Sequence, residues 1–290
     1  MATFDDHPDT ASPGRTAAAR PSAGEADRTP GAPAAAPTPL PRRLAGVELL
    51  LVLGVSLGAS GVRALLSFVG SVTRPEGLAA QQAVLAGSAA PGRPWLDLAW
   101  QLYYIGAALV PVALVAYLLL REGGSLRTSL GCDLRRPLGD LGRGTAVAAA
   151  IGGTGLLLYL GARASGANLT VVPSTLPDVW WRIPILVGQS LENAIVEEVI
   201  VLGFLVHRLR GMGWGWSSVV ATSSLVRGSY HLYQGIGGFV GNVAMGVVFC
   251  FLYRRWGRVM PLLVAHALID IVAFVGFVLL AGRVSWLPTG

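Results

Sequence analysis

Carboxylates occur inside a stretch that is otherwise apolar and long enough to cross a membrane. Residues 190–209, SLENAIVEEVIVLGFLVHRL, contain Glu192, Glu197 and Glu198. A charged side chain at the centre of a bilayer costs about 2.5–3.5 kcal/mol even on the lenient insertion scale, so such residues face protein or water and mark functional sites. Other polar residues in this and later apolar segments are Asn193, Arg227, His231, Asn242, His266 and Asp270.

The spacing of the first group predicts how it is oriented. Glu197 and Glu198 are adjacent, so on a helix they point about 100° apart. One carboxylate can therefore face a cavity while the other faces a neighbouring helix. Asn193 lies four residues before Glu197, on the same helix face. We expect Asn193 to support this site, and we assign no catalytic role to Glu192.

Two later segments each present a pair of polar residues four positions apart. Arg227 and His231 form the first pair, and His266 and Asp270 form the second. A carboxylate beside an imidazole orients the ring and fixes its tautomer. The three segments can thus bring Glu–Glu, Arg–His and His–Asp pairs to a common centre.

Carboxylates and imidazoles in a water-poor pocket can perform acid–base chemistry. A glutamate could deprotonate a water molecule, and a histidine could stabilise the oxyanion of an attacked carbonyl. The alternative is Zn²⁺ held by Glu197, His231 and His266. The spacing is not HExxH, and each ligand would come from a separate segment, so we favour no cofactor.

The order and spacing of these motifs resemble the CPBP family. These are intramembrane peptidases related to the type II CAAX prenyl endopeptidase and to bacteriocin-processing and immunity proteins. The family pattern is EExxxR, then FxxxH, then HxxxN or HxxxD in successive segments. The corresponding stretches here are EEVIVLG (197–203), RGSYH (227–231) and HALID (266–270), within a resemblance that covers roughly 180–275.

The resemblance implies an intramembrane endopeptidase that cleaves a membrane-associated protein or peptide. It implies that Glu197 is the general base that activates water, with Glu198 as its supporting neighbour. It also implies that His231 positions the water and that His266 and Asp270 stabilise the oxyanion. The metal-free, glutamate-dependent mechanism is the one we favour for this family, although it was first named a metalloprotease.

Two positions depart from the family pattern. The arginine of EExxxR is replaced by Leu202, and the phenylalanine of FxxxH is replaced by Arg227. A buried arginine cannot lose its charge, so it needs a partner. We predict that Arg227 reaches Glu198 or Glu197 within about 4 Å and binds the Glu198 carboxylate through two parallel hydrogen bonds.

Two other functions remain open at this stage. A relative that kept the fold and lost activity would act by binding, as an immunity or scaffold protein. Buried glutamate, histidine and aspartate also form proton relays, so a proton-coupled carrier is the second alternative. Most carriers of this kind contain an internal repeat, and no repeat stands out in this chain.

Composition supports a membrane protein. The 290 residues are 53% hydrophobic and 13% charged, against about 25% charged in soluble domains. We predict an all-α, polytopic membrane helix bundle over 44–290, with a catalytic core at about 180–275. The Pro- and Ala-rich residues 1–43 predict a disordered cytoplasmic tail. The predicted spans, about seven, are 44–72, 94–120, 144–164, 181–207, 216–232, 236–253 and 259–281.

Arginine placement predicts the orientation, with the N-terminus in the cytoplasm of an integral cell-membrane protein. Most arginines outside the N-terminal tail flank apolar runs, and Arg63 and Arg227 lie inside them, so we expect membrane lipid as a partner and no nucleic acid. Twelve arginines then lie inside: Arg42, Arg43, Arg121, Arg127, Arg135, Arg136, Arg143, Arg208, Arg210, Arg254, Arg255 and Arg258. Five lie outside: Arg74, Arg93, Arg163, Arg182 and Arg283.

Overall fold

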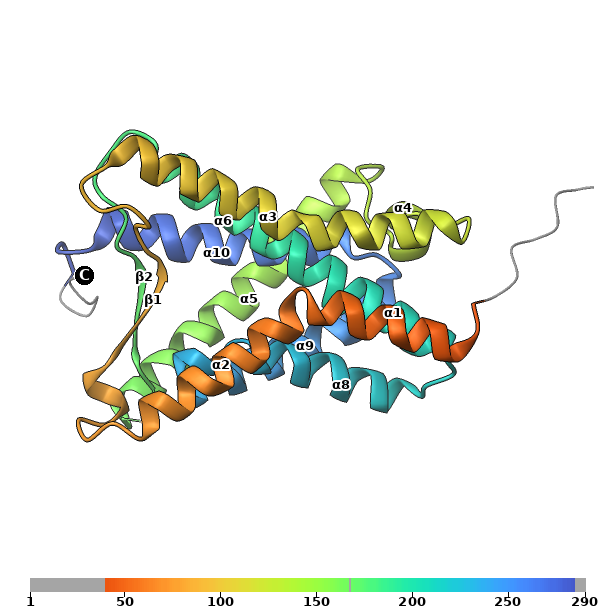
Figure 1. The fold of residues 1–290 in the computed structure, drawn as a ribbon, viewed down its shortest axis with the longest axis horizontal. Coiled ribbons are helices and arrows are strands. Elements are labelled where there is room, and N and C mark those ends of the chain that lie inside the picture. Colours follow the sequence, from red (N-terminus) through yellow and green to blue (C-terminus); the bar gives the residue numbers. More distant parts are fainter. Residues whose placement is uncertain (1–39, 167, 285–290) are drawn as a thin grey trace, which may run out of the picture. The chain divides into compact units, whose positions relative to one another are not determined.

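The structure is a computed structural model that describes residues 40–166 and 168–284, and these form an all-α membrane helix bundle (Figure 1). Most of the predicted disordered tail, residues 1–39, lies outside the described residues. The first helix begins at Arg42, two residues before the predicted boundary. Helix geometry leaves the first backbone N–H groups without partners, so the Pro41 ring, which has no N–H, suits this helix entry.

The described chain is a succession of helices with one small sheet. In the first half they are α1 (Arg42–Gly54), α2 (Leu57–Val72), α3 (Pro94–Arg121), α4 (Leu126–Leu130) and α5 (Pro137–Ala164). In the second half they are α6 (Arg182–Glu197), the π-helix η2 (Glu198–Phe204), α7 (Leu205–Gly211), α8 (Trp216–Ser229), α9 (Ile236–Trp256) and α10 (Met260–Leu280). Two 3₁₀ turns are η1 (Leu78–Ala80) and η3 (Leu232–Gln234).

Fewer helices than predicted meet the length and hydropathy expected of a membrane span. Among the described residues these are α3, α5, α9 and α10, and the α1–α2 pair, bent by 52°, adds a fifth if it crosses as one unit. Helix α6 has 16 residues and α8 has 14, short of the roughly 20 that a span needs. The apolar helices make this an integral membrane protein, and the count of seven spans stays a prediction.

A two-stranded parallel sheet closes one end of the bundle, and the sequence analysis did not predict it. Strand β1 (Gln82–Ala86) pairs with β2 (Thr170–Ser174), with Val84 opposite Val172. The strands belong to the connections before α3 and before α6, which are far apart in sequence. Figure 1 shows them at the end of the bundle opposite α4.

Ion pairs join the chain at the other end of the bundle. Arg208 contacts Glu48 at 2.7 Å and Glu122 at 2.5 Å, which ties α7 to α1 and to the end of α3. Arg258 contacts Asp133 at 3.1 Å and Asp140 at 2.6 Å, which ties the α9–α10 turn to the α4–α5 connection and to the first turn of α5. The arginines predicted to be cytoplasmic therefore gather at one end, called here the arginine-rich end.

The continuous segment α6–η2–α7 forms the centre of the apolar core. Every residue from Val196 to Val206 is buried. A helix that is buried all round belongs to the core of a bundle rather than to its lipid-facing surface. The two adjacent glutamates therefore lie in the most enclosed part of the molecule, and only polar neighbours can make that favourable.

Candidate active site

A change of helix type places the glutamate pair. Glu197 is the last residue of α6, and Glu198 is the first residue of the π-helix η2. Short π-helices within α-helices often occur at functional sites. Glu197 is 1% exposed and Glu198 is fully buried. Only Glu197 lines the large cavity described below, so the two carboxylates face different surroundings, as predicted.

Arg227 contacts both carboxylates. Its Nη2 lies 2.6 Å from Glu198 Oε1, and its Nη1 lies 3.2 Å from Glu197 Oε2. The predicted contact is therefore present, but the predicted two-fold binding of Glu198 alone is wrong. The α6–η2 junction presents one oxygen from each glutamate to the arginine fork, and the guanidinium bridges them. Leu202, where the family pattern has arginine, is buried in the apolar core.

Close packing of α8 on α9 allows Arg227 to reach this position. A Cβ atom on Gly228 would lie 2.5 Å from Val243 Cγ2, so only glycine permits the observed approach. The guanidinium carbon of Arg227 then lies 5.3 Å from the ring centroid of Phe249 on α9. A cation over an aromatic face is stabilised by the ring quadrupole.

His266 on α10 contacts the same cluster. Its Nδ1 lies 2.7 Å from Glu198 Oε1, and its Nε2 lies 3.6 Å from Asp270 Oδ2. The second distance is too long for a hydrogen bond, so Glu198, rather than Asp270, orients the ring. Asp270 Oδ2 instead accepts a hydrogen bond of 2.8 Å from Asn193 Nδ2. Asn193 thus supports Asp270 and not Glu197.

His231 does not lie on a helix, so its predicted helical pairing with Arg227 is wrong. Helix α8 ends at Ser229, and His231 lies in the turn before η3. Gln234 Nε2 lies 3.2 Å from His231 Nδ1. The Gln234 amide N–H can donate to Nδ1, an arrangement that goes with a ring proton on Nε2. That nitrogen lies 3.5 Å from Glu197 Oε1.

Tyr230 belongs to the site and was missed by the sequence analysis. Its hydroxyl donates a hydrogen bond of 2.9 Å to Glu197 Oε2. The side chain is buried, and buried tyrosines generally find a partner for the hydroxyl. The sequence feature that could have revealed Tyr230 is its position directly before His231 in the RGSYH motif. Gln234 was also missed, and its role depends on a turn that spacing alone does not show.

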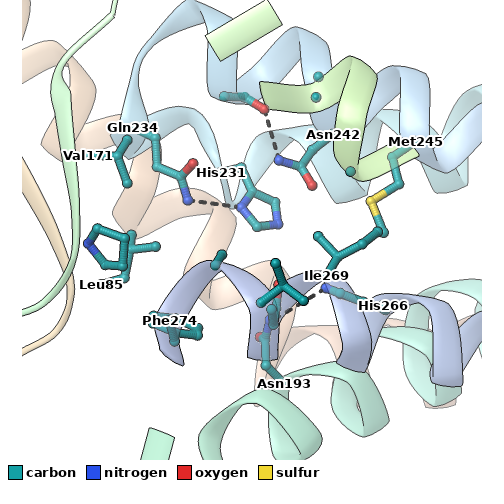
Figure 2. A pocket seen from close by; sticks show the side chains of 18 of the residues that line it. Leu85, Val171, Asn193, His231, Gln234, Asn242, Met245, His266, Ile269 and Phe274 are labelled. Atoms are coloured by element: carbon teal, nitrogen blue, oxygen red, sulfur yellow. Dashed lines mark hydrogen bonds and ion pairs between the residues drawn. The ribbon is translucent and has the colours of Figure 1, made fainter. Parts of the chain in front are cut away.

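These side chains form one wall of a cavity of about 1370 Å³. Figure 2 shows His231 and Gln234 on one side of it and His266 and Asn193 on the other. Its remaining walls are mostly apolar, with Met245, Ile269 and Phe274 among them. Glu192 and Asn242 also line it. A large apolar cavity with a few converging polar groups is the usual form of a ligand or catalytic site.

The site contains a group of residues that could hold a metal ion. The group with suitable ligand atoms within 4.8 Å of one another is Glu197, Glu198 and His266, without the predicted His231. Arg227 is bonded to both carboxylates of that group. Because Arg227 holds one oxygen of each carboxylate, a divalent cation would have to bind the other oxygens and would be repelled by the nearby guanidinium.

The fold and the site define an integral membrane protein with a buried Glu–Glu–Arg–His cluster at the wall of an interior cavity. Residues 179–272 match the family model of the Rce1-like type II CAAX prenyl endopeptidases. The match confirms the resemblance found in the motifs, covers Asn193 to Asp270, and supports a CAAX-type intramembrane protease. Comparisons with curated proteins and with solved structures found no match.

Proposed function

We propose that this protein is an intramembrane endopeptidase that uses Glu197 to activate water and cleaves a peptide bond of a membrane-associated protein or peptide. The observation that carries the proposal is that Glu197 lines the cavity and Glu198 does not. Glu198 Oε1 receives contacts from both Arg227 and His266. Glu197 is held through Oε2, while its Oε1 has only the longer contact to His231 Nε2.

This difference assigns the base. Glu198 does not line the cavity, and its second carboxylate oxygen, Oε2, is buried without a hydrogen-bond partner among the described residues. We therefore assign Glu198 to orienting Arg227 and His266 through Oε1. Glu197 has a free oxygen at the cavity wall and is positioned by Arg227 and Tyr230 through the other one, so it is the group that can take a proton.

The reaction follows from the positions of these atoms. Glu197 Oε1 removes a proton from a water molecule that is also held by His231 Nε2–H. The water oxygen then attacks the carbonyl carbon of the scissile peptide bond, and the carbonyl oxygen becomes an oxyanion. The proton passes from Glu197 to the leaving amide nitrogen, the C–N bond breaks, and a carboxyl and an amino end are released.

His266 is the group we assign to the oxyanion. The carboxylates of Glu198 and Asp270 lie at its two ring nitrogens, 2.7 and 3.6 Å away. Two negative neighbours stabilise the imidazolium, whose Nε2–H can donate to the oxyanion. Glu198 holds the ring through Nδ1, and Asn193 fixes Asp270 near Nε2. The positive charge required near the oxyanion thus comes from His266 and Arg227, without a metal.

The test is peptide cleavage by the purified protein and its Glu197→Gln variant. Glutamine is nearly isosteric but cannot accept the proton, so we expect cleavage of a quenched peptide library to fall at least about 1000-fold. Glu76→Gln, at an exposed loop residue, is the control for the chemical change and should cleave normally. Equal cleavage by Glu197→Gln and wild type would remove the mechanism.

Metal dependence is checked on the same preparation. We expect wild-type activity to survive exhaustive chelation, and elemental analysis to find no stoichiometric zinc. Loss of activity on chelation with recovery on adding Zn²⁺ would replace the metal-free mechanism. Absence of cleavage by wild type, with a cellular phenotype retained by Glu197→Gln, would favour a silent binding protein.

A further inference from the structure

We infer that Glu192 forms a cation-binding subsite in the wall of the cavity and selects polypeptides that carry a lysine or arginine side chain close to the scissile bond. The selection of substrates rests on the proposed function, whereas the binding of a basic side chain at Glu192 does not. The inference depends on where Glu192 lies, on its lack of a partner among the described residues, and on the charges of the cavity lining.

Glu192 lies on the face of α6 that borders the cavity. Gln189, Asn193 and Glu197 border the cavity from the same helix. Residues three and four positions apart share a helix face, so these four side chains form one polar stripe along α6. Glu192 is only partly buried, and its carboxylate is therefore accessible to a molecule bound in the cavity.

The polar neighbours of Glu192 on α6 bind other groups. Gln189 Nε2 donates a hydrogen bond of 2.8 Å to Gln101 Oε1, and Asn193 Nδ2 donates one of 2.8 Å to Asp270 Oδ2. Among the described residues, no hydrogen bond or ion pair reaches the Glu192 carboxylate, in contrast to Asp270, which Asn193 holds. Glu192 is thus a carboxylate of the cavity wall that the catalytic cluster does not use.

The charges of the cavity lining favour a cation at this position. Arg227 is absent from the lining, as is every other arginine of the part of the chain that the structure describes, and the sequence contains no lysine. The basic side chains that do line the cavity, His231 and His266, each lie against a carboxylate of the catalytic cluster. The group that can pair with Glu192 is therefore a cation supplied by a ligand.

The mostly apolar walls make such a pair selective. A carboxylate among apolar side chains loses part of its hydration, and an opposite charge with good geometry compensates for that loss. Two charges interact more strongly in a medium of low dielectric constant than in bulk water. Like charges brought together at a binding site are strongly unfavourable. We therefore expect Glu192 to favour basic side chains and to reject acidic ones.

The spacing along α6 indicates where the basic residue lies in the substrate. Glu192 precedes Glu197 by five residues, which is about 7.5 Å along the helix axis. An extended polypeptide rises about 3.3 Å per residue. In a substrate strand that runs along α6 with its scissile bond at Glu197, the side chain facing Glu192 is therefore about two residues from that bond. The long apolar stems of lysine and arginine suit the apolar walls.

The subsite is tested by a binding measurement that needs no catalysis. The protein carries Glu197→Gln and is placed in nanodiscs of phosphatidylcholine, which has no net charge. The probes are short, fluorescently labelled apolar peptides that differ only in a central lysine, methionine or glutamate. We expect the lysine peptide to bind at least about tenfold more tightly than the glutamate peptide. Adding Glu192→Gln should remove most of this preference, and adding Glu192→Lys should reverse it.

The control is Glu76→Lys, which makes the same change of charge at an exposed loop residue and should keep the preference for the lysine peptide. Equal binding of the lysine and glutamate peptides would overturn the subsite. A preference that survives Glu192→Gln, or no binding of any of the peptides, would overturn it as well. If Glu192→Lys does not fold, the comparison with Glu192→Gln decides.

The selection of substrates is tested with quenched peptides on protein that retains Glu197. Lysine, methionine or glutamate is placed in turn at each position near the cleaved bond. We expect cleavage at least about tenfold faster with lysine than with glutamate at one position about two residues from that bond. The ratio should approach one in Glu192→Gln. A ratio that Glu192→Gln leaves unchanged, with all peptides cleaved more slowly, would assign Glu192 to the chemistry and overturn the selection.

The two measurements separate this inference from the proposed function. Cleavage without any charge preference would leave the peptidase standing and remove the subsite. Failure of the wild type to cleave any peptide, together with Glu192-dependent binding of the lysine peptide, would contradict the peptidase function. The cation-binding subsite would then stand, because the binding measurement has no catalytic readout.

Discussion

At the scale of single residues, one guanidinium neutralises two adjacent buried carboxylates. Arg227 contacts Glu197 and Glu198 with different nitrogens, and all three side chains are at most 2% exposed. Buried charges are tolerated only when they are paired, and removing one partner costs more than the pair itself contributes. Leu202 cannot pair with a carboxylate. Arg227 from α8 therefore supplies the positive charge that stabilises the two buried glutamates.

Replacement of Arg227 should consequently be severe. Arg227→Leu leaves Glu198 with His266 as its remaining partner, and we expect a loss of about 3–5 kcal/mol in the free energy of unfolding. The measurement is thermal unfolding in detergent together with peptide cleavage. Arg255→Leu, at an exposed arginine of α9, is the control and should change little.

The same substitution has a rescue test. Leu202→Arg combined with Arg227→Phe restores the family arrangement, so it should recover part of the stability and cleavage lost in Arg227→Leu. A double variant that is no more stable than Arg227→Leu would show that an arginine at position 202 cannot take over this pairing.

Replacement of Tyr230 should have a smaller effect than replacement of Arg227. Tyr230→Phe removes the hydroxyl that donates to Glu197 Oε2. A hydrogen bond to a charged group contributes about 1.5–3 kcal/mol, so we expect kcat to fall roughly tenfold or more with KM little changed. The checks are steady-state kinetics and comparison with Tyr253→Phe, a tyrosine of α9 outside the cavity lining. An unchanged kcat for Tyr230→Phe would mean that the hydroxyl does not position Glu197.

At the scale of elements, the site depends on how α8, α9 and the π-helix fit together. Helix α8 carries Arg227, helix α9 carries Phe249 beneath it, and η2 begins with Glu198. Gly228 follows Arg227 directly, and its missing side chain sets the α8–α9 distance. A small change at this contact should therefore be transmitted to the guanidinium.

Gly228→Ala tests this contact. The added Cβ would lie 2.5 Å from Val243 Cγ2 and 3.0 Å from Phe239 Cδ2. Overpacking of this kind costs about 1–3 kcal/mol, and we expect lower thermal stability together with weaker cleavage. Gly70→Ala on α2, where nothing lies within 4 Å, is the matched control and should be neutral or stabilising. Equal behaviour of the two variants would contradict the role of close packing.

At the scale of the whole molecule, the ion pairs of the arginine-rich end join helices distant in sequence. Hydrogen bonding to Arg208 lowers the pKa of Glu122 below its ordinary value. A carboxylate with a lowered pKa in the folded state stabilises the protein above the ordinary glutamate pKa of about 4.3. That stability is lost as the pH falls through the lowered value.

Glu122→Gln should reveal this contribution. The variant cannot ionise, so we expect its Tm to be a few degrees below that of wild type at pH 7, because the pair is partly exposed and screened by solvent. The difference should shrink as the pH falls below about 4. Thermal unfolding across this pH range, with Glu76→Gln as control, is the measurement. A difference that stays constant with pH would show that ionisation of Glu122 does not matter.

The sequence by itself determined the class of fold and which charged residues and histidines gather at the candidate site. Long apolar runs interrupted by Glu197, His231 and His266 can be stable in a bilayer only if helices bring those residues together, so the clustering followed from the cost of burying charge. The need of Arg227 for a carboxylate partner followed from the same cost. These are local chemical requirements, and they can be read from residue types and spacing.

Only the tertiary structure decided which atoms meet. The π-helix after Glu197, the end of α8 at Ser229 and the β1–β2 pair depend on packing between segments far apart in the chain, for which no local pattern exists. These features decided that Arg227 bridges two glutamates, that Glu198 orients His266, and that Tyr230 reaches Glu197. Side-chain partners depend on angles and distances that a helical repeat predicts only within one element, so the geometry of the site had to come from the fold.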